Sequence, residues 1–193
     1  MSSNLDRARS YEEKVGKQIP DGQKCVFHLT PEVGWMNDPN GFSLYRGEYH
    51  LFYQYHPYSS VWGPMHWGHQ KTRDFIKWEQ LPCALAPDTE YDGQGCFSGS
   101  AVEHEGKHIL MYTGVLDRVE ADGSHTLRQT QCIAVGDGVN YEKLPANPVI
   151  TADALPEGSS GEDFRDPRIW KEGNTFYAAV GSLGADGSGQ IAL

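Results

Sequence analysis

Residues 46–53 read Arg-Gly-Glu-Tyr-His-Leu-Phe-Tyr, and a matching run at residues 105–112 reads Glu-Gly-Lys-His-Ile-Leu-Met-Tyr. A third version begins at residues 172–177 with Glu-Gly-Asn-Thr-Phe-Tyr. In each run a charged residue and a glycine precede aromatic and aliphatic residues, which is the signature of a β-hairpin. The runs recur with a period of roughly 60 residues, which favours a radially repeated β-structure.

The second half of each unit repeats as well. Residues 66–70 lead into Lys-Trp-Glu-Gln-Leu-Pro at 77–82, and residues 131–135 lead into Asn-Tyr-Glu-Lys-Leu-Pro at 140–145. Each unit therefore holds about four short strands, the size of a propeller blade. We predict an all-β protein and favour a β-propeller over a β-sandwich, which could give a similar pattern.

We expect a polar arm or short helix at residues 1–24 and the propeller at residues 25–193. The third unit ends at Gln-Ile-Ala-Leu, residues 190–193, where its third strand should begin. This predicts a chain truncated within blade three, covering about two and a half blades. A propeller cut at that point leaves open sheet edges, so we expect a fragment of a longer protein.

The composition of the chain excludes several classes of partner and location. The formal net charge of −10 argues against nucleic acid or an anionic membrane as a partner, whereas neutral sugars are compatible with it. The four cysteines form no Cys-x-x-Cys pair. The polar N-terminus lacks the apolar core of a signal peptide, and no apolar run approaches the ~18 residues of a membrane helix. We expect a cytoplasmic protein with reduced thiols.

Two Asp-Pro dipeptides stand at matched places in the repeat. Residues 35–41 read Trp-Met-Asn-Asp-Pro-Asn-Gly, which places Asp38 before a predicted tight turn at residues 40–41 and a strand from Phe42. Asp166 lies in Arg-Asp-Pro, also just before a hairpin strand. Ordinary turn chemistry is one interpretation. We favour convergence of both carboxylates with Arg165 in a central funnel, because a buried acid needs a partner.

A competing motif is His104-Glu-Gly-Lys-His108, which matches the zinc-protease pattern His-Glu-x-x-His. That chemistry requires a helix, whereas this segment aligns with the hairpin turns, so we predict no metal site. His66 and His69 are predicted to lie on a strand surface, and the glycine-rich residues 181–189 in a loop. Trp62 lies in a predicted loop, where a sugar-stacking role and a core role remain open.

Residues 35–41, Phe-Tyr-Gln at 52–54, Phe-Ser-Gly-Ser at 97–100 and Arg-Asp-Pro at 165–167 together resemble glycoside hydrolase family 32. That family includes invertases, sucrose-6-phosphate hydrolases, inulinases and levanases. The resemblance runs from about Phe27 to the end of the chain. It implies a five-bladed β-propeller followed by a β-sandwich, which would be absent here.

The resemblance also implies roles for individual residues. Asp38 matches the nucleophile, and Asp166, with Arg165 beside it, matches the carboxylate that stabilises the transition state. The residues that match the fructose subsite are Trp35, Asn37, Gln54, Trp62, Phe97 and Ser98. The third acid of the family is a Glu in a Glu-Cys pair, for which residues 1–193 hold no match. No cofactor is implied.

We therefore hypothesise a β-fructofuranosidase that cleaves sucrose or sucrose 6-phosphate by a retaining two-step mechanism. The 193-residue piece itself would be inactive without the third acid. Alternatives are a fructan hydrolase, a fructosyltransferase or a non-catalytic sugar-binding propeller. The expected partner is a small fructoside, and the oligomeric state is open.

Overall fold

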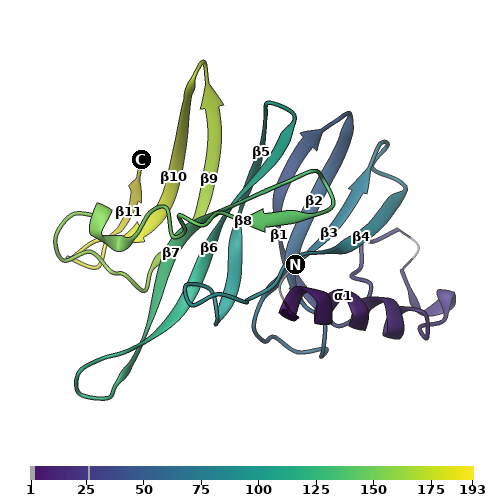
Figure 1. Cartoon of the computed structure of the whole chain (residues 1–193), viewed down its shortest axis with the longest axis horizontal. Coiled ribbons are helices and arrows are strands. Elements are labelled where there is room, and N and C mark those ends of the chain that lie inside the picture. The colour runs from purple at the N-terminus through teal and green to yellow at the C-terminus, as the bar shows by residue number, and fades with distance from the viewer. Residues whose placement is uncertain (1–2, 26) are drawn as a thin grey trace.

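A computed structural model describes residues 3–25 and 27–193. Three antiparallel sheets follow one another along the chain and stand side by side like blades (Figure 1). The first sheet contains β1 (Trp35–Tyr45), β2 (Glu48–His56), β3 (His66–Thr72) and β4 (Trp78–Leu85). The second contains β5 (Gly95–His104), β6 (Lys107–Val119), β7 (His125–Gly136) and β8 (Tyr141–Lys143). The third contains β9 (Phe164–Glu172), β10 (Thr175–Leu183) and β11 (Gly189–Ala192).

Each sheet is a meander in which neighbours in sequence pair with one another. The predicted hairpin turns at residues 46–47, 105–106 and 173 are confirmed: they join β1 to β2, β5 to β6 and β9 to β10. Arg46 and Glu105 adopt positive φ together with the glycines that follow them, as two-residue hairpin turns require. The third strand predicted at residues 190–193 is also present, as β11.

The tight turn predicted at residues 40–41 is wrong, because β1 runs through it without interruption. The strand instead shifts register between Asn40 and Ser43. Gly41 has φ +56°, and a Cβ on it would lie 2.5 Å from the Phe52 ring. The glycine therefore permits a bulge that brings the backbone against a core aromatic ring.

Helix α1 (Ser3–Gly16) lies against β4, the outermost strand of the first sheet (Figure 1). Short 3-10 helices follow at η1 (Asp21–Gln23) and η2 (Ala152–Ala154). Leu5 and Ala8 pack with Tyr53, Tyr55 and other apolar residues of the first sheet. The Arg9 side chain donates hydrogen bonds to Cys83 O at 2.9 Å and to Asn140 Oδ1 at 2.8 Å, so the helix links β4 of the first sheet to the β7–β8 connection of the second.

The main core lies between the first two sheets. It combines apolar residues such as Trp67, Leu85, Leu110 and Tyr112 with a buried polar group around His108. His108 Nε2 lies 2.8 Å from Ser43 Oγ and Nδ1 lies 2.8 Å from Tyr141 OH. Because the Ser43 hydroxyl donates to Gly41 O, Nε2 carries the imidazole proton and Nδ1 accepts from the tyrosine.

Three further sequence predictions can be compared with the structure. His66 and His69 were predicted on a strand surface, and this is wrong: both are buried within β3. Residues 181–183 of the predicted glycine-rich loop are the end of β10, and only residues 184–188 form the turn. The four cysteines are free thiols, with Cys25 exposed and the others buried.

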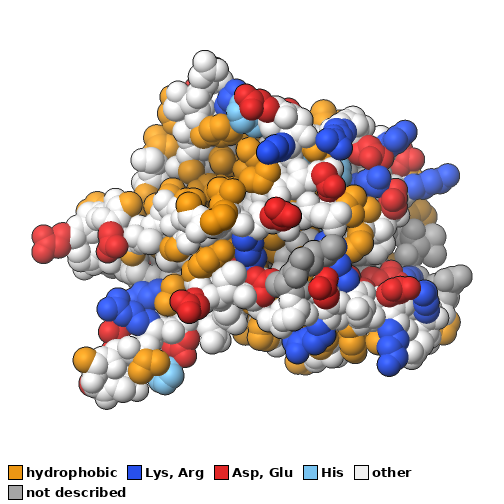
Figure 2. Space-filling model, in the orientation of Figure 1, with side chains coloured by type: hydrophobic (Ala, Val, Ile, Leu, Met, Phe, Trp, Pro, Cys, Tyr) orange, Lys and Arg blue, Asp and Glu red, His pale blue; other side chains and the backbone are white. Residues whose placement is uncertain are grey.

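Acidic and basic side chains are interspersed over α1 and the neighbouring strands of the first sheet (Figure 2). Within residues 3–25 and 27–193, no helix combines the length and hydropathy needed to cross a bilayer.

The buried carboxyl of Glu12 on α1 predicts a pH-dependent stability. Its Oε2 accepts a hydrogen bond from Cys83 N at 3.0 Å, and burial raises its pKa to about 7. The folded protein therefore holds this proton more tightly than the unfolded chain, and stability falls as pH rises from 4.5 towards 7. Glu12→Gln should match the wild type near pH 4.5 and exceed it by about 3 kcal/mol at pH 8, measured by urea unfolding. Glu13→Gln, on the exposed side of the helix, is the control; the same gain in that variant would contradict the assignment.

The buried histidines predict the opposite trend in a Glu12→Gln background. Burial lowers the pKa of His66 to about 4 and that of His108 to about 3, whereas both titrate near 6.5 when unfolded. The unfolded chain therefore binds more protons below pH 6.5. Lowering the pH from 6.5 to 5 should cost about 2 kcal/mol per histidine in the free energy of unfolding. His108→Gln should reduce this slope and exposed His28→Gln should not; a flat profile would refute the prediction.

Candidate active site

The first strand of each sheet is interrupted by a bulge at the same end. In β1, Met36 pairs with Tyr55 and Pro39 with Tyr53. Two residues, Asn37 and Asp38, therefore lie opposite the single residue Gln54 of β2. In β5 the register shifts between Phe97 and Gly99, which leaves Ser98 as the extra residue. In β9, Asp166 and Pro167 occupy the same kind of interruption between Arg165 and Arg168.

These bulges explain how the chain displays its polar side chains. A bulge leaves its extra residue outside the hydrogen-bonded ladder and redirects its side chain. Proline has no N–H to give to a ladder, so it is tolerated at bulges and at sheet edges, where both Asp-Pro dipeptides lie. The equivalent bulges on β1, β5 and β9 therefore turn their side chains towards the space between the three sheets.

A cavity of about 180 Å³ occupies that space. It is lined by Asn37, Asp38, Gln54, Trp62, Phe97, Ser98, Arg165 and Asp166. Eight of the nine site residues predicted from sequence are thus brought together, from four strands of three sheets (β1, β2, β5 and β9) and the β2–β3 connection. Trp35 is the exception. It is not among the lining residues, but its indole Nε1 donates to Asn37 Oδ1 at 2.8 Å and so orients that amide.

Asp166 is held in an unusual backbone conformation. Its φ is +62°, in the left-handed region that aspartate tolerates better than most residues. Its N–H donates to Thr113 Oγ1 at 3.1 Å, and the Thr113 hydroxyl donates to Gln131 Oε1 at 2.9 Å. Gln131 Nε2 in turn donates to Phe164 O at 2.8 Å, which closes the chain of hydrogen bonds on β9 itself. This network holds the backbone at Asp166 in that conformation.

The electrostatics link the two aspartates. Partial burial raises the pKa of the Asp166 carboxyl, the Arg165 guanidinium opposes this shift, and the nearby charge of Asp38 adds to it. Arg165 is shared with other partners, because its NH1 donates to Gln129 Oε1 at 3.0 Å and to Asp163 Oδ1 at 3.1 Å. Two carboxyls that influence each other across one small cavity are typical of sites that use them chemically.

The remaining walls combine an amide with two aromatic rings. Gln54 is buried, and its Nε2 donates to Cys96 O at 3.0 Å, which fixes the amide at the cavity. Trp62 lies in the β2–β3 connection, as predicted, with 55% of its surface exposed. Its ring meets Phe97 edge to face at 6.3 Å, so an apolar surface faces the carboxylates. Such a surface suits the C–H face of a sugar ring.

Sequence reasoning missed the residues that support this site, Thr113, Gln129 and Gln131. The available signal was a run of polar residues, Gln-Thr-Gln at 129–131, within a strand that should otherwise be apolar. Thr113, Gln129 and Gln131 are all buried. Their side chains hydrogen-bond to the backbone of Phe164 and Asp166.

The zinc-protease segment forms a β5–β6 hairpin, as the sequence predicted. His104 and His108 lie on different strands, and His108 is engaged with Ser43 and Tyr141. In the part of the chain that the structure describes, no group of three or more potential metal ligands gathers.

Comparisons with known proteins agree with this geometry. The family model for the N-terminal domain of glycosyl hydrolases family 32 matches residues 28–193. The sucrose-6-phosphate hydrolase of Zymomonas mobilis is 44% identical over 98% of this chain and 37% of its own length. The raffinose invertase of Escherichia coli is 40% identical over 100% of this chain and 39% of its own length. The chain therefore spans well under half of these relatives.

Solved structures give the same result. The β-fructofuranosidase of Bombyx mori superimposes with a TM-score of 0.82 at 42% identity, over 97% of this chain and 38% of that one. A variant of that enzyme has been solved in complex with sucrose. The sucrose-6-phosphate hydrolase of Lactobacillus gasseri gives a TM-score of 0.74 at 35% identity, over 97% of this chain and 36% of that one. These N-terminal domains are five-bladed β-propellers, so the three sheets described here are blades of such a propeller.

The electrostatic link between the aspartates can be measured directly. In Asp38→Asn, the pKa of Asp166 should fall, because a neighbouring negative charge is removed. In Arg165→Gln it should rise. Carboxyl-detected NMR titration of each variant measures both shifts, with Asp6→Asn on α1 as the control. An Asp166 pKa that is indifferent to Asp38 would show that the two side chains do not share a cavity.

Proposed function

Because this chain belongs to glycoside hydrolase family 32, we propose that it carries the nucleophile and the transition-state-stabilising carboxylate of a β-fructofuranosidase. Its substrate would be a terminal β-fructofuranoside, sucrose or sucrose 6-phosphate. The observation that carries the proposal is the shared cavity of Asp38 and Asp166, which also presents an amide, a guanidinium and aromatic faces.

In the first step, an Asp38 oxygen attacks the anomeric carbon of the fructosyl unit while the bond to the leaving oxygen breaks. The leaving oxygen takes a proton from a third acid. Asp38 and Asp166 are the two carboxylates that line this cavity among the described residues, and both have other roles in this scheme. We therefore assign the proton donor to a Glu outside these 193 residues, about 5–5.5 Å from Asp38, as a retaining mechanism requires.

In the second step, water attacks the covalent fructosyl-enzyme and gives a proton back to the third acid, now a carboxylate. The bond to Asp38 breaks and its carboxylate is regenerated, so the configuration is retained. Positive charge develops on the sugar ring in both transition states. The Asp166 carboxylate, fixed by its backbone hydrogen bond to Thr113, stabilises that charge without having to reorient. Asn37 and Gln54 present amide groups to the sugar hydroxyls, and Trp62 covers an apolar face.

The test is a fusion of residues 1–193 to the remaining length of the Zymomonas mobilis relative, assayed for fructose release from sucrose. Asp38→Asn in this fusion should lower kcat by about 10⁴-fold or more while leaving the fold intact, because no covalent intermediate can form. Asp6→Asn, on the surface of α1, should leave kcat unchanged.

Two results would contradict the proposal. Substantial sucrose hydrolysis by the folded Asp38→Asn fusion would rule out the nucleophile. Sucrose binding without any turnover in the unmutated fusion would favour a sugar-binding propeller. The 193-residue chain alone should bind sugar without cleaving it.

A further inference from the structure

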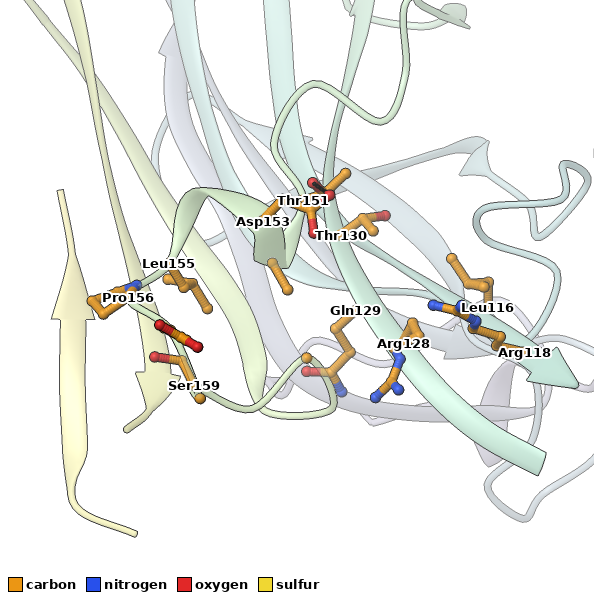
Figure 3. Close-up of a pocket in the computed structure, with 14 residues that line it drawn as sticks. Leu116, Arg118, Arg128, Gln129, Thr130, Thr151, Asp153, Leu155, Pro156 and Ser159 are labelled. Atoms are coloured by element: carbon orange, nitrogen blue, oxygen red, sulfur yellow. Dashed lines mark hydrogen bonds between the residues drawn. The ribbon is translucent and has the colours of Figure 1, made fainter. Parts of the chain in front are cut away.

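The two sides of the candidate active site are supported in different ways. On one side, Gln129 projects from the strand β7 (Figure 3), and its Oε1 accepts from Arg165 NH1 at 3.0 Å. On the other side, Trp62 lies in the β2–β3 connection, residues 57–65, and is exposed. Connections are more mobile than strands, so the direction of a side chain on one of them depends on the contacts that hold its backbone.

His56, the last residue of β2, contacts both neighbours of Trp62. Its Nδ1 donates to Val61 O at 3.0 Å, because a carbonyl oxygen can only accept. On the other side of Trp62, a Cβ on Gly63 would lie 2.4 Å from His56 Cε1, so the glycine lets the backbone pass directly against the imidazole ring. The backbone before and after Trp62 is therefore held by a single ring.

Tyr58 packs against that ring from within the same connection. Its ring centre lies 5.9 Å from that of His56 and 5.7 Å from that of His66, edge to face in both cases. His66 is buried, and its Nδ1 donates to Pro64 O at 2.9 Å, which fixes the far end of the connection. Edge-to-face contacts between rings are favourable and directional. Tyr58 therefore contacts both histidines that hold the Trp62 segment.

Helix α1 holds Tyr58 in turn, since it lies beside the β2–β3 connection (Figure 1). Tyr11 meets the Tyr58 ring edge to face at 5.2 Å. Arg7 Nε donates to Tyr58 OH at 3.2 Å, and the guanidinium carbon lies 4.9 Å from the centre of the same ring, within the range of a cation–π interaction. Arg7 and Tyr11 are four positions apart, so they lie on the same face of the helix.

The helix can act as a fixed support because it is anchored to the first sheet independently of this connection. Leu5 and Ala8 are buried among apolar residues of that sheet, and Asn4 Nδ2 donates to Pro87 O at 2.8 Å. The helix also lies outside residues 28–193, which the model of the family's N-terminal domain matches. An element outside that domain therefore reaches the wall of the site.

We propose that α1 is a positioning element for substrate binding. Arg7 and Tyr11 fix Tyr58. Tyr58 in turn fixes the His56 ring, which holds the backbone that presents Trp62 to the sugar. Tyr58 is thus a positioning residue, since it acts on the sugar only through Trp62. This inference rests on the proposed function, because it takes Trp62 as the cover of the sugar ring.

The test is a double-mutant cycle, measured as KM and kcat for sucrose in the fusion described above. Tyr58→Ala should raise KM about fivefold, the effect of a lost aromatic contact, and should leave kcat within about twofold. KM alone should respond because Trp62 covers the sugar equally in the ground state and the transition state. In a Trp62→Ala background, Tyr58→Ala should change KM by less than about twofold, since the group that it positions is gone.

Further variants test which contacts of Tyr58 matter and whether the support begins at the helix. Tyr58→Phe keeps the ring contacts and should raise KM less than Tyr58→Ala does. Arg7→Gln should raise KM about threefold, because it removes both the hydrogen bond and the cation–π contact. Lys14→Gln is the matched control, since it removes the same charge from an exposed position of α1 and should leave KM unchanged.

A second measurement observes Trp62 directly and needs no turnover. In residues 1–193 labelled with 5-fluorotryptophan, Trp62→Phe assigns the ¹⁹F signal of Trp62. Tyr58→Ala and Arg7→Gln should each shift or broaden that signal and leave the signal of Trp170, on β9, unchanged. Lys14→Gln should change neither signal.

The outcomes separate the inference from the proposed function. An unchanged Trp62 signal in Tyr58→Ala, or an equal rise in KM with and without Trp62, would overturn the inference while the proposed function stands. A fall in kcat at constant KM would also overturn it. If Tyr58→Ala does not fold, the same cycle is run with Arg7→Gln, which changes an exposed residue. If the unmutated fusion released no fructose, the proposed function would fail, and the inference with it.

Discussion

The site depends on one backbone irregularity used three times, the bulge that opens the first strand of each sheet. Regular pairing would alternate the side chains of β1, β5 and β9 between the two faces of their sheets. The bulges break that alternation at Asp38, Ser98 and Asp166, where the three strands come together. On either side of each bulge the first strand pairs with its neighbour, β2, β6 or β10, so the ladder anchors the bulged residues while their side chains face the cavity.

The angle between neighbouring sheets matters as much as the bulges, because the cavity is built across them. Polar contacts set that angle. His108 of the second sheet reaches Ser43 of the first, and the Ser100 hydroxyl of the second donates to Pro167 O of the third and accepts from Ile169 N, both at 2.7 Å. Apolar packing alone tolerates small sliding, whereas these directional bonds are satisfied in one arrangement. The distance between the walls of the site is therefore fixed by residues outside it.

Local patterns of glycine, charge and apolar residues predicted the repeat and the hairpin turns. The repeat also placed Asp38, Arg165 and Asp166 together, whereas Asn37, Gln54, Phe97 and Ser98 were expected at the site because the sequence resembles the family. Prediction from sequence failed where a local pattern has two structural solutions. The Asn-Gly pair at residues 40–41 favours a turn in isolation, yet packing of Gly41 against Phe52 keeps the strand continuous. His69 reads as a polar strand residue, yet it is buried in a stack on the Phe52 ring at 4.0 Å. Gln129 could not be placed, since its role arises from contact with Arg165, 36 positions away.

The two aspartates are not equivalent, and the structure indicates why. Asp166 sits in a left-handed conformation that costs free energy and is held there by Thr113. Because its pKa is raised, the negatively charged form of the Asp166 carboxyl is disfavoured in this site. A sugar ring that becomes positively charged in the transition state would relieve that disadvantage at the moment it forms, which is stabilisation specific to the transition state. Asp38, which we propose as the nucleophile, would need freedom to approach carbon. Its position on β1, directly before Pro39, restricts its backbone, while its carboxylate lines the cavity.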